Sequence, residues 1–240
     1  MSALVVERDY VLTHIIEALA RLHPPPGLVF KGGTAVRLCF YEDYRYSADL
    51  DFSLVELSVE DGLELLRSAL ERCLEAVGLP RLALADAEPL DVEYVGPLGR
   101  ARTIKLDLAD DELVLETTQR TVIPRYSDQS EDGSTIPTYT LEEIAAEKLR
   151  CVMQRLLCRD ISDLHRLFVR EGIEVQTVWP LFEEKTRAKS LDPGRFGERL
   201  SARELHYRQR WEQELADVEP DVPPFDEIIR QLRRALRDHV

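Results

Sequence analysis

The stretch Ser47-Ala48-Asp49-Leu50-Asp51-Phe52-Ser53-Leu54 decides the fold of this chain, because it places two carboxylates on alternate positions of an apolar, strand-like run. In a β-strand successive side chains point to opposite faces, so Asp49 and Asp51 share one face and the apolar side chains share the other. Two aspartates on one face repel each other and resist desolvation unless a cation lies between them. The pattern therefore predicts a strand whose polar face binds a divalent metal ion.

A glycine-rich turn precedes this strand. Residues 28–30 are the apolar run Leu-Val-Phe, which is followed by Lys31, Gly32, Gly33 and Thr34 and then by apolar residues at helical spacing. This order predicts a strand, a tight turn and the start of a helix. Glycines let a ligand approach the backbone, and the first amides of a helix bind anions. We therefore expect the turn from Lys31 to Thr34 to bind phosphates beside the metal, as transfer from a nucleoside triphosphate with Mg²⁺ or Mn²⁺ requires.

A third carboxylate, Asp107, lies on a later run of alternating residues. Residues 103–108 place isoleucine and leucine side chains on one face and Lys105 and Asp107 on the other. Asp107 either completes the catalytic carboxylate set from a neighbouring strand or faces solvent on a half-exposed antiparallel strand. The sequence leaves both interpretations open.

A lysine interrupts the apolar face of a helix that is expected to begin at Leu141. Lys148 lies four residues after Ile144 and four before Val152, within that face. Such a lysine either extends to water or points its ammonium group at anions. The phosphate turn and the aspartate pair favour the phosphate-binding role. Asp160 and Asp163 come at the start of the next apolar helix, where capping is the ordinary role for Asp160.

These segments together resemble the AbiEii/AbiGii toxin family of nucleotidyltransferase-like proteins. The resemblance is carried by residues 30–54, with Lys-Gly-Gly-Thr and Arg-Tyr-Ser-Ala-Asp-Leu-Asp-Phe-Ser, and by blocks at residues 103–107, 141–149 and 159–164. It implies an α/β (α+β) fold, with a polymerase-β-like mixed sheet and a helical C-terminal half. It also implies that the protein is a toxin with a cognate antitoxin. The toxins of this family are nucleotidyltransferases, and some of them transfer a nucleotide from a nucleoside triphosphate to tRNA.

The resemblance also assigns roles to single residues. Asp49 and Asp51 fall on the family's metal-binding pair. Related polymerase-type enzymes have Gly-Ser where this chain has Gly-Gly-Thr, a change that keeps a hydroxyl group. The residues implied to bind the nucleotide are Gly33, Thr34, Ser47, Lys148 and Asp160 or Asp163.

The remaining periodicity predicts two domains, an α/β domain over residues 1–135 and a helical domain over residues 136–240. The resemblance implies that the first of these is nucleotidyltransferase-like. Helices are expected over residues 4–22, from the glycine turn to about residue 40, and from the N-cap Ser58 to about Gly78. Strands are expected at residues 90–95, 103–109 and 112–118. After Thr140 the pattern is helical throughout.

Composition narrows the class of protein. The net charge of −14 argues against a protein that coats nucleic acid non-specifically. No apolar stretch is long enough to span a membrane and the start lacks a signal-peptide layout, so we expect a cytoplasmic protein that does not bind membranes. The four cysteines show no zinc-binding spacing and are expected to be reduced structural thiols. Candidates to contact RNA in the helical half are Arg150, Arg155, Arg159, Arg166 and the arginines of residues 203–210.

The leading hypothesis is a metal-dependent nucleotidyltransferase toxin whose acceptor hydroxyl is at the 3′ end of tRNA. Transfer of a nucleoside monophosphate to a protein hydroxyl is the first alternative, and the acidic net charge favours it. A catalytically silent protein that binds nucleotide or antitoxin is the second. A metal-dependent nuclease is the third, and it leaves the glycine turn unexplained.

Overall fold

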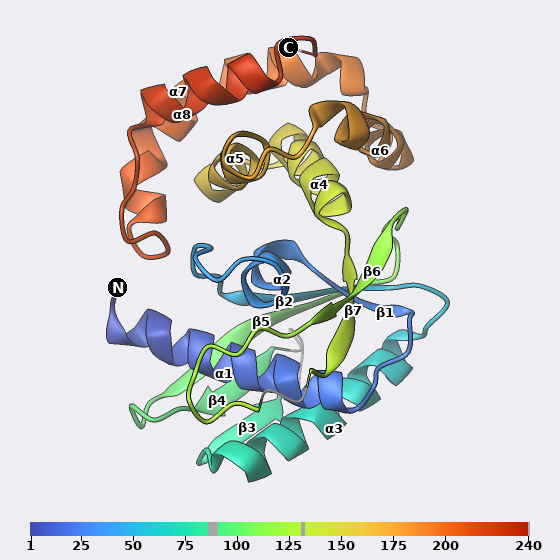
Figure 1. Cartoon of the computed structure of the whole chain (residues 1–240), viewed down its shortest axis with the longest axis vertical. Helices are drawn as coiled ribbons and strands as arrows, with labels where there is room; N and C mark the ends of the chain where they lie inside the picture. Colours follow the sequence, from blue (N-terminus) through green and yellow to red (C-terminus); the bar gives the residue numbers. More distant parts are fainter. Residues whose placement is uncertain (86–90, 131–132, 240) are drawn as a thin grey trace. The chain divides into compact units, whose positions relative to one another are not determined.

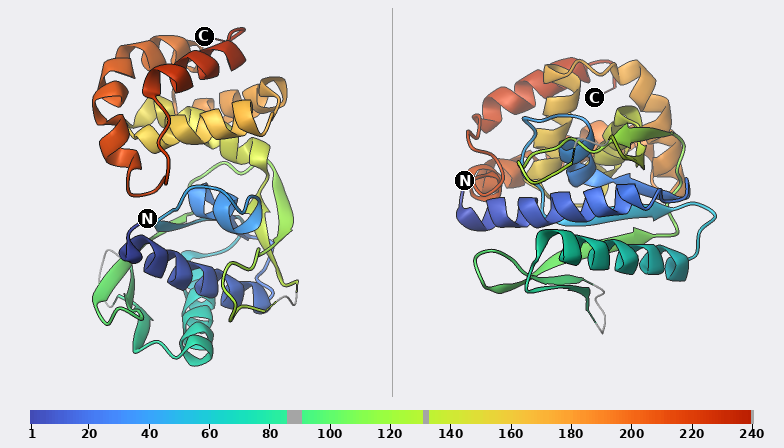
Figure 2. Two further views of the ribbon diagram at one scale, coloured as in Figure 1. Left: turned by 60° about the vertical axis from the view of Figure 1, so that its left-hand side comes forward. Right: turned by 60° about the horizontal axis from the view of Figure 1, so that its bottom comes forward.

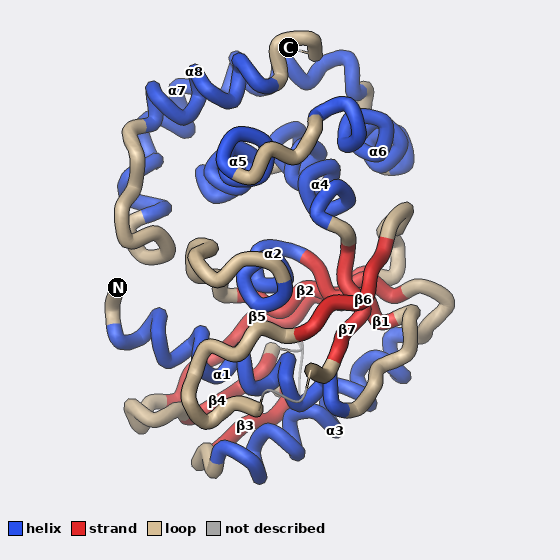
Figure 3. Tube along the Cα trace, in the orientation of Figure 1, coloured by secondary structure: helices blue, strands red, loops and turns tan. Residues whose placement is uncertain are grey.

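The computed structural model describes residues 1–85, 91–130 and 133–239 and divides the chain into two compact units, Met1–Tyr139 and Thr140–Val240. The described strands all belong to the first unit, whereas the second contains helices joined by loops (Figure 3). The division follows the last strand. The boundary expected from the sequence falls after residue 135, within β7 (Thr135–Tyr139).

The first unit is built on one mixed sheet with the strand order β3-β4-β5-β2-β1-β7-β6. Pairing is parallel between β2 and β5 and between β1 and β7, and it is antiparallel for the other neighbours. The expected mixed α/β sheet is confirmed. The strands are β1 (Leu28–Lys31), β2 (Asp49–Leu54), β3 (Arg81–Leu84), β4 (Val92–Val95), β5 (Ala101–Ala109), β6 (Thr117–Thr121) and β7 (Thr135–Tyr139).

One face of this sheet forms the core of the first unit. Phe30 and Phe52 pair across β1 and β2 with their ring centres 5.2 Å apart, and both are fully buried. The helices α1 (Ala3–Arg21) and α3 (Val59–Val77) pack against each other and against this face (Figures 1 and 2). The short helix α2 (Gly32–Cys39) connects β1 to β2 and adds Ala35 and Leu38 to the same core. The opposite face of β2 is thereby left for polar side chains.

The ends of α3 follow the chemistry that the sequence predicts. The Ser58 side chain accepts a hydrogen bond of 3.1 Å from the backbone N–H of Asp61, so Ser58 is the N-cap. At the other end Gly78 has φ 67°, a left-handed conformation in which glycine avoids the steric penalty of a side chain. Both signals are local, which is why the sequence alone locates this helix correctly.

The second unit is a bundle around α4. Its neighbours α5, α6 and α7 all contact α4, and the interior contains Phe182, Tyr207 and Trp211. A short π-helical segment, Arg166–Arg170, extends α5, and a 3₁₀ turn, Pro193–Arg195, precedes α7. The helices are α4 (Leu141–Gln154), α5 (Cys158–His165), α6 (Val175–Ala188), α7 (Phe196–Leu215) and α8 (Phe225–Ala235).

The expected strand at residues 112–118 is wrong. Residues 112–116 are not part of a strand in the structure, and β6 begins only at Thr117. The edge position beside β7 is taken by residues 117–121 instead. β7 was not expected, since Pro137 in its centre removes a backbone donor and argues against a strand. The strand expected to start at residue 90 is described from Val92; residue 90 lies outside the described residues.

The four cysteines are free and buried, as expected from their spacing. Burial raises the pKa of Cys39 and of Cys73 to about 12, so these thiols stay protonated at neutral pH. Within the described part of the chain, none of the helices combines the length and apolarity needed to cross a membrane.

Candidate active site

The glycine turn joins β1 to α2 directly. Lys31 is the extended N-cap residue of α2, and Gly32 follows it with φ 76°, which only glycine adopts without a steric penalty. A Cβ atom on Gly32 would lie 2.5 Å from Oδ2 of Asp51. Gly32 therefore serves two needs at once, the sharp bend of the chain and room for a carboxylate of the acidic strand.

The acidic strand alternates as its sequence predicts. Leu50 and Phe52 are fully buried in the core, whereas Asp49 and Asp51 are half-buried on the other face. The Thr34 hydroxyl donates a hydrogen bond of 2.6 Å to the backbone carbonyl of Asp49. The close approach of Gly32 to Asp51 and the hydrogen bond from Thr34 to Asp49 thus place the glycine turn beside the aspartate pair.

Asp107 lies on the strand beside this pair. The parallel register of β2 and β5 sets Asp51 opposite Asp107 and Asp49 opposite Lys105. Asp107 is exposed and points to the same face of the sheet as the pair, because directly paired residues share a face. We refer to Asp49, Asp51 and Asp107 as the carboxylate row.

The carboxylate row fits a metal ion that is shared with substrate. Among the described residues no group of three or more His, Cys, Asp or Glu side chains is gathered closely enough to enclose a metal ion. Mg²⁺ is usually held by one or two carboxylates together with substrate phosphates and water, so a closed protein cage is not needed. The half-buried carboxylates of Asp49 and Asp51, beside the glycine turn, match that donor set.

Two side chains meet the second glycine of the turn. A Cβ atom on Gly33 would lie 3.2 Å from Oγ of Ser47 and 2.9 Å from Nη2 of Arg45. Ser47, which the resemblance implied, therefore lies at the turn. Arg45 is a neighbour that the sequence analysis did not single out, although it stands inside the motif that carried the resemblance.

Lys31 also lies beside the polar face. In the antiparallel register of β1 and β2, Lys31 lies opposite Asp51. Its ammonium nitrogen lies 5.8 Å from the ring centre of Tyr139 on β7. The Tyr139 hydroxyl shares a 2.6 Å hydrogen bond with Ser53. The first unit thus places a cation, three carboxylates and a glycine turn on one region of its sheet.

Lys148, Asp160 and Asp163 form a separate cluster within the second unit. The Lys148 ammonium lies 3.0 Å from Asp160 and 2.7 Å from Asp163, and all three side chains are buried. Arg155 donates to Asp160 at 2.7 and 2.9 Å. Burial alone would raise the pKa of Asp160, but Lys148 and Arg155 hold this pKa below its ordinary value.

This cluster changes the interpretation of two residues. Lys148 does not extend to water, since its side chain is only 8% exposed and pairs with carboxylates. Asp160 is not the N-cap of α5: that position is Leu157, which makes no side-chain capping bond. The expected contact of Lys148, Asp160 or Asp163 with a nucleotide stays a prediction.

The arginines proposed to contact RNA are mostly bound to acidic groups of their own unit. Arg155 binds Asp160, and Arg166 lies 2.6 Å from Glu171. On α7, Arg208 pairs with Asp226 and Glu204, and Arg210 lies 2.7 Å from Glu214. Such pairing reduces the positive field that attracts nucleic acid, so these helices present no simple basic stripe.

The order strand, glycine turn, helix and acidic strand, set in a mixed sheet, is the arrangement of a nucleotidyltransferase. The family model described as "Nucleotidyl transferase AbiEii toxin, Type IV TA system" matches residues 14–231. The chain therefore belongs to the AbiEii family of nucleotidyltransferase toxins of type IV toxin–antitoxin systems. Membership in this family implies a nucleoside triphosphate substrate, an antitoxin partner and, as is usual for such enzymes, a divalent metal.

One solved structure supports this fold, and a second gives a weaker match. MenT4, a nucleotidyltransferase toxin from Mycobacterium tuberculosis H37Rv, superposes with a TM-score of 0.69 at 20% identity, over 98% of this chain and 84% of that one. A nucleotidyltransferase-like antigen from Paracoccidioides brasiliensis gives a TM-score of 0.43 at 14% identity, over 78% of this chain and 94% of that one. No curated protein matches the chain in sequence.

Proposed function

We propose that this protein transfers a nucleotide from a nucleoside triphosphate to an acceptor hydroxyl at the 3′ end of tRNA. The observation that carries the proposal is the 2.5 Å separation between Asp51 Oδ2 and the position of a Cβ on Gly32. It puts donors suited to phosphate and carboxylates suited to a cation at one place. A triphosphate bound there would have the donors of the turn on one side and the carboxylates, with their cation, on the other, as nucleotidyl transfer requires.

The phosphates would be bound by the turn. The first amides of α2, from Gly33 onward, face the N-terminal side of the helix, where the helix dipole favours anions. Thr34 is held by its bond to the Asp49 carbonyl and so fixes the turn relative to the acidic strand. Lys31 and Ser47 would add a cation and a hydroxyl beside the β and γ phosphates.

A divalent ion, Mg²⁺ or Mn²⁺, would be held by Asp49 and Asp51, with Asp107 from the adjacent strand. When bound, it would neutralise charge on the leaving pyrophosphate and lower the pKa of the acceptor hydroxyl. The acceptor oxygen forms the bond to the α-phosphorus while the bond to the β-phosphate oxygen breaks. The acceptor proton passes to a carboxylate of the row and then to water.

The test offers the enzyme both classes of acceptor. Wild type, Asp49→Ala and the exposed control Glu71→Ala on α3 are incubated with each α-labelled nucleoside triphosphate, Mg²⁺, total tRNA and a protein pool. We expect label in tRNA that is lengthened at its 3′ end, with wild type and Glu71→Ala alike and with Asp49→Ala inactive. Shortened RNA would indicate a nuclease and would overturn the proposal, as would full activity of Asp49→Ala.

Label in the protein pool would instead support transfer of a nucleoside monophosphate to a protein hydroxyl. The net charge of −14 and the ion-paired arginines of the second unit favour this second candidate, because both weaken attraction to RNA. Binding of nucleotide without transfer to either pool would support a catalytically silent binding protein.

A further inference from the structure

The side chain of Arg45 lies against the glycine turn. Its residue is 8% exposed, and its guanidinium approaches the Cβ position of Gly33 with Nη2 at 2.9 Å and Cζ at 3.5 Å. Ser47 Oγ lies 3.2 Å from the same point. A buried guanidinium and a hydroxyl thus converge on the backbone that is expected to bind phosphates.

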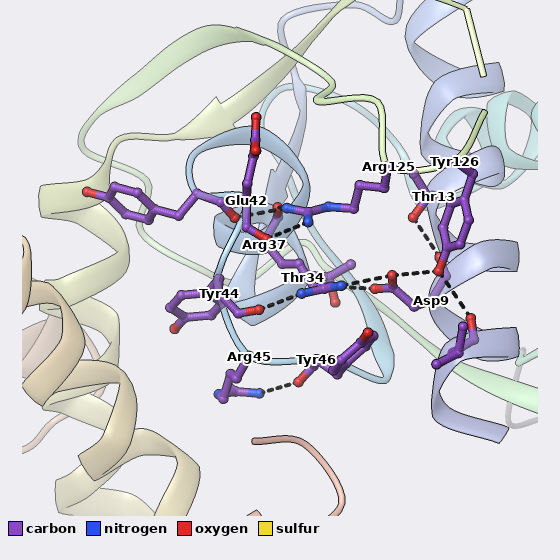
Figure 4. A network of polar contacts seen from close by, with 12 residues as sticks. Asp9, Thr13, Thr34, Arg37, Glu42, Tyr44, Arg45, Tyr46, Arg125 and Tyr126 are labelled. Atoms are coloured by element: carbon purple, nitrogen blue, oxygen red, sulfur yellow. Dashed lines mark hydrogen bonds and ion pairs between the residues drawn. The ribbon is translucent and has the colours of Figure 1, made fainter. Parts of the chain in front are cut away.

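Neighbouring tyrosines hold Arg45 in this position. Its Nη1 donates a 2.9 Å hydrogen bond to the Tyr46 carbonyl, and its guanidinium lies 5.6 Å from the ring centre of Tyr44 (Figure 4). An arginine that is fixed before the ligand arrives loses less conformational entropy when it binds. The contacts therefore prepare the guanidinium for a ligand at the turn.

A second arginine fixes the segment that carries Arg45. Arg37, on α2, donates a 2.5 Å hydrogen bond to the Tyr44 carbonyl, and its guanidinium stacks 4.0 Å from the ring centre of Tyr46. Asp9 on α1 holds Arg37 through bonds of 2.5 and 3.0 Å (Figure 4). Arg37 thus acts on the site only through the residues on either side of Arg45.

The end of α2 is fixed from the other side. Arg125 donates to the carbonyls of Glu42 at 2.7 Å, Tyr41 at 2.9 Å and Arg37, and the Tyr126 hydroxyl donates to Asp9 at 2.9 Å. The segment between α2 and the acidic strand is therefore tied to α1 and to residues 125–126 of the first unit. These hydrogen bonds fix the position of the segment that carries Arg45.

We propose that Arg45 binds the β or γ phosphate of the nucleoside triphosphate. This inference rests on the proposed function. A guanidinium is weakly hydrated and presents forked donors that match phosphate oxygens, so a buried position suits it better than it suits an ammonium group. Arg45 belongs to the same unit as the glycine turn and lies against it, so its guanidinium is placed to meet a phosphate bound there.

The experiment measures dissociation constants by equilibrium dialysis in Mg²⁺. The probes are ATP, CTP, GTP and UTP and their monophosphates, with wild type, Arg45→Gln, Arg45→Lys and the control Arg120→Gln. Arg120 also donates to a backbone carbonyl, that of Cys39, and stacks 4.7 Å from the Phe40 ring centre, but at the opposite end of α2.

We expect Arg45→Gln to weaken triphosphate binding about 10- to 100-fold, as loss of a charged hydrogen bond does, without changing monophosphate binding. Arg45→Lys should lie between wild type and Arg45→Gln, and Arg120→Gln should match wild type. Thermal unfolding checks each variant, and if Arg45→Gln does not fold, Arg45→Lys carries the test.

Equal triphosphate binding by wild type and the Arg45 variants would overturn the inference while leaving the proposed function intact. Equal loss of triphosphate and monophosphate binding would also overturn it. Absence of triphosphate binding by wild type would overturn the proposed function itself, so the two failures are distinguishable.

Discussion

The carboxylate row of the first unit and the Lys148 cluster of the second are two opposite arrangements of neighbouring charges. In the row, Asp49, Asp51 and Asp107 have the same sign and share one face of a sheet, beside a turn that is suited to phosphates. In the cluster, Asp160 and Asp163 surround Lys148 within 3.0 Å. Like charges on one face of the row are suited to bind a cation between them, whereas the cluster brings carboxylates and an ammonium group together.

This difference predicts which substitutions change the activity of the protein and which change its stability. Substitutions in the row should change what the protein binds and catalyses, because the repulsion among its carboxylates contributes nothing to folding. Substitutions in the Lys148 cluster should change folding first, because each leaves a charge buried without its partner. The four predictions below test that division.

The largest effect is expected for Asp49→Ala. Transfer should fall by at least about 10³-fold, because the ion that we propose at this site would supply several kcal/mol of charge stabilisation in the transition state. The melting temperature should stay constant or rise, since the change relieves repulsion with Asp51. Steady-state kinetics and thermal unfolding measure the two quantities. A stability loss as large as the activity loss would show that the row is structural.

Gly32→Ala isolates the contact between turn and carboxylate. Both Gly32 and Gly99 have φ above 70°, so alanine at either position costs about 1–2 kcal/mol of backbone strain. A Cβ at Gly99 meets nothing within 4 Å, whereas at Gly32 it meets Asp51 at 2.5 Å. We therefore expect Gly32→Ala to lower the urea-unfolding free energy at least as much as Gly99→Ala does, and only Gly32→Ala to lose transfer. Full transfer by Gly32→Ala would separate the turn from the catalytic row.

Lys148→Met tests the second half of the comparison. Removing one partner of a buried ion pair costs about 3–5 kcal/mol, so urea unfolding should show a loss of that order. The control is Arg187→Met, whose 2.8 Å pair with Glu183 is largely exposed, and which should change stability by less than about 1 kcal/mol. Equal small losses for both would mean that the cluster does not stabilise the fold. This prediction holds whether or not Lys148 also contacts a nucleotide.

The smallest effect concerns pH. The folded-state pKa of Asp160 is lowered, so its carboxylate contributes stability that is present above the unfolded pKa and lost as pH falls through the folded one. The difference in unfolding free energy between wild type and Asp160→Asn should therefore narrow between pH 7 and pH 3. Urea unfolding across this range measures it. A difference that stays constant would contradict the assigned ion pairs.

Local patterns in the sequence predicted the parts of the structure that depend on neighbours in the chain. The alternation around Asp49 and Asp51 gave the faces of β2, and the Ser58 pattern gave the start of α3. The glycine turn was predicted because its conformation needs residues that are adjacent in sequence.

The sequence did not predict contacts between residues that are far apart in the chain. The Asp9–Arg37 pair joins residues 28 positions apart, and no spacing rule predicts such a contact. The position of Arg45, which depends on this pair, was therefore not predicted. The register that sets Asp107 beside Asp51 depends on strand order, which left two interpretations of Asp107 open. Lys148 was recognised as unusual, but its partners lie on another helix.

The most direct test of the central claim uses two labels on the same substrate. Wild-type protein is incubated with Mg²⁺, an acceptor pool of tRNA and protein, and each nucleoside triphosphate labelled at either the α or the γ phosphate. Nucleotidyl transfer at the row and the turn predicts α label in the acceptor and γ label in released pyrophosphate. Transfer of the γ label to the acceptor, or no transfer from any of the four substrates, would contradict the account.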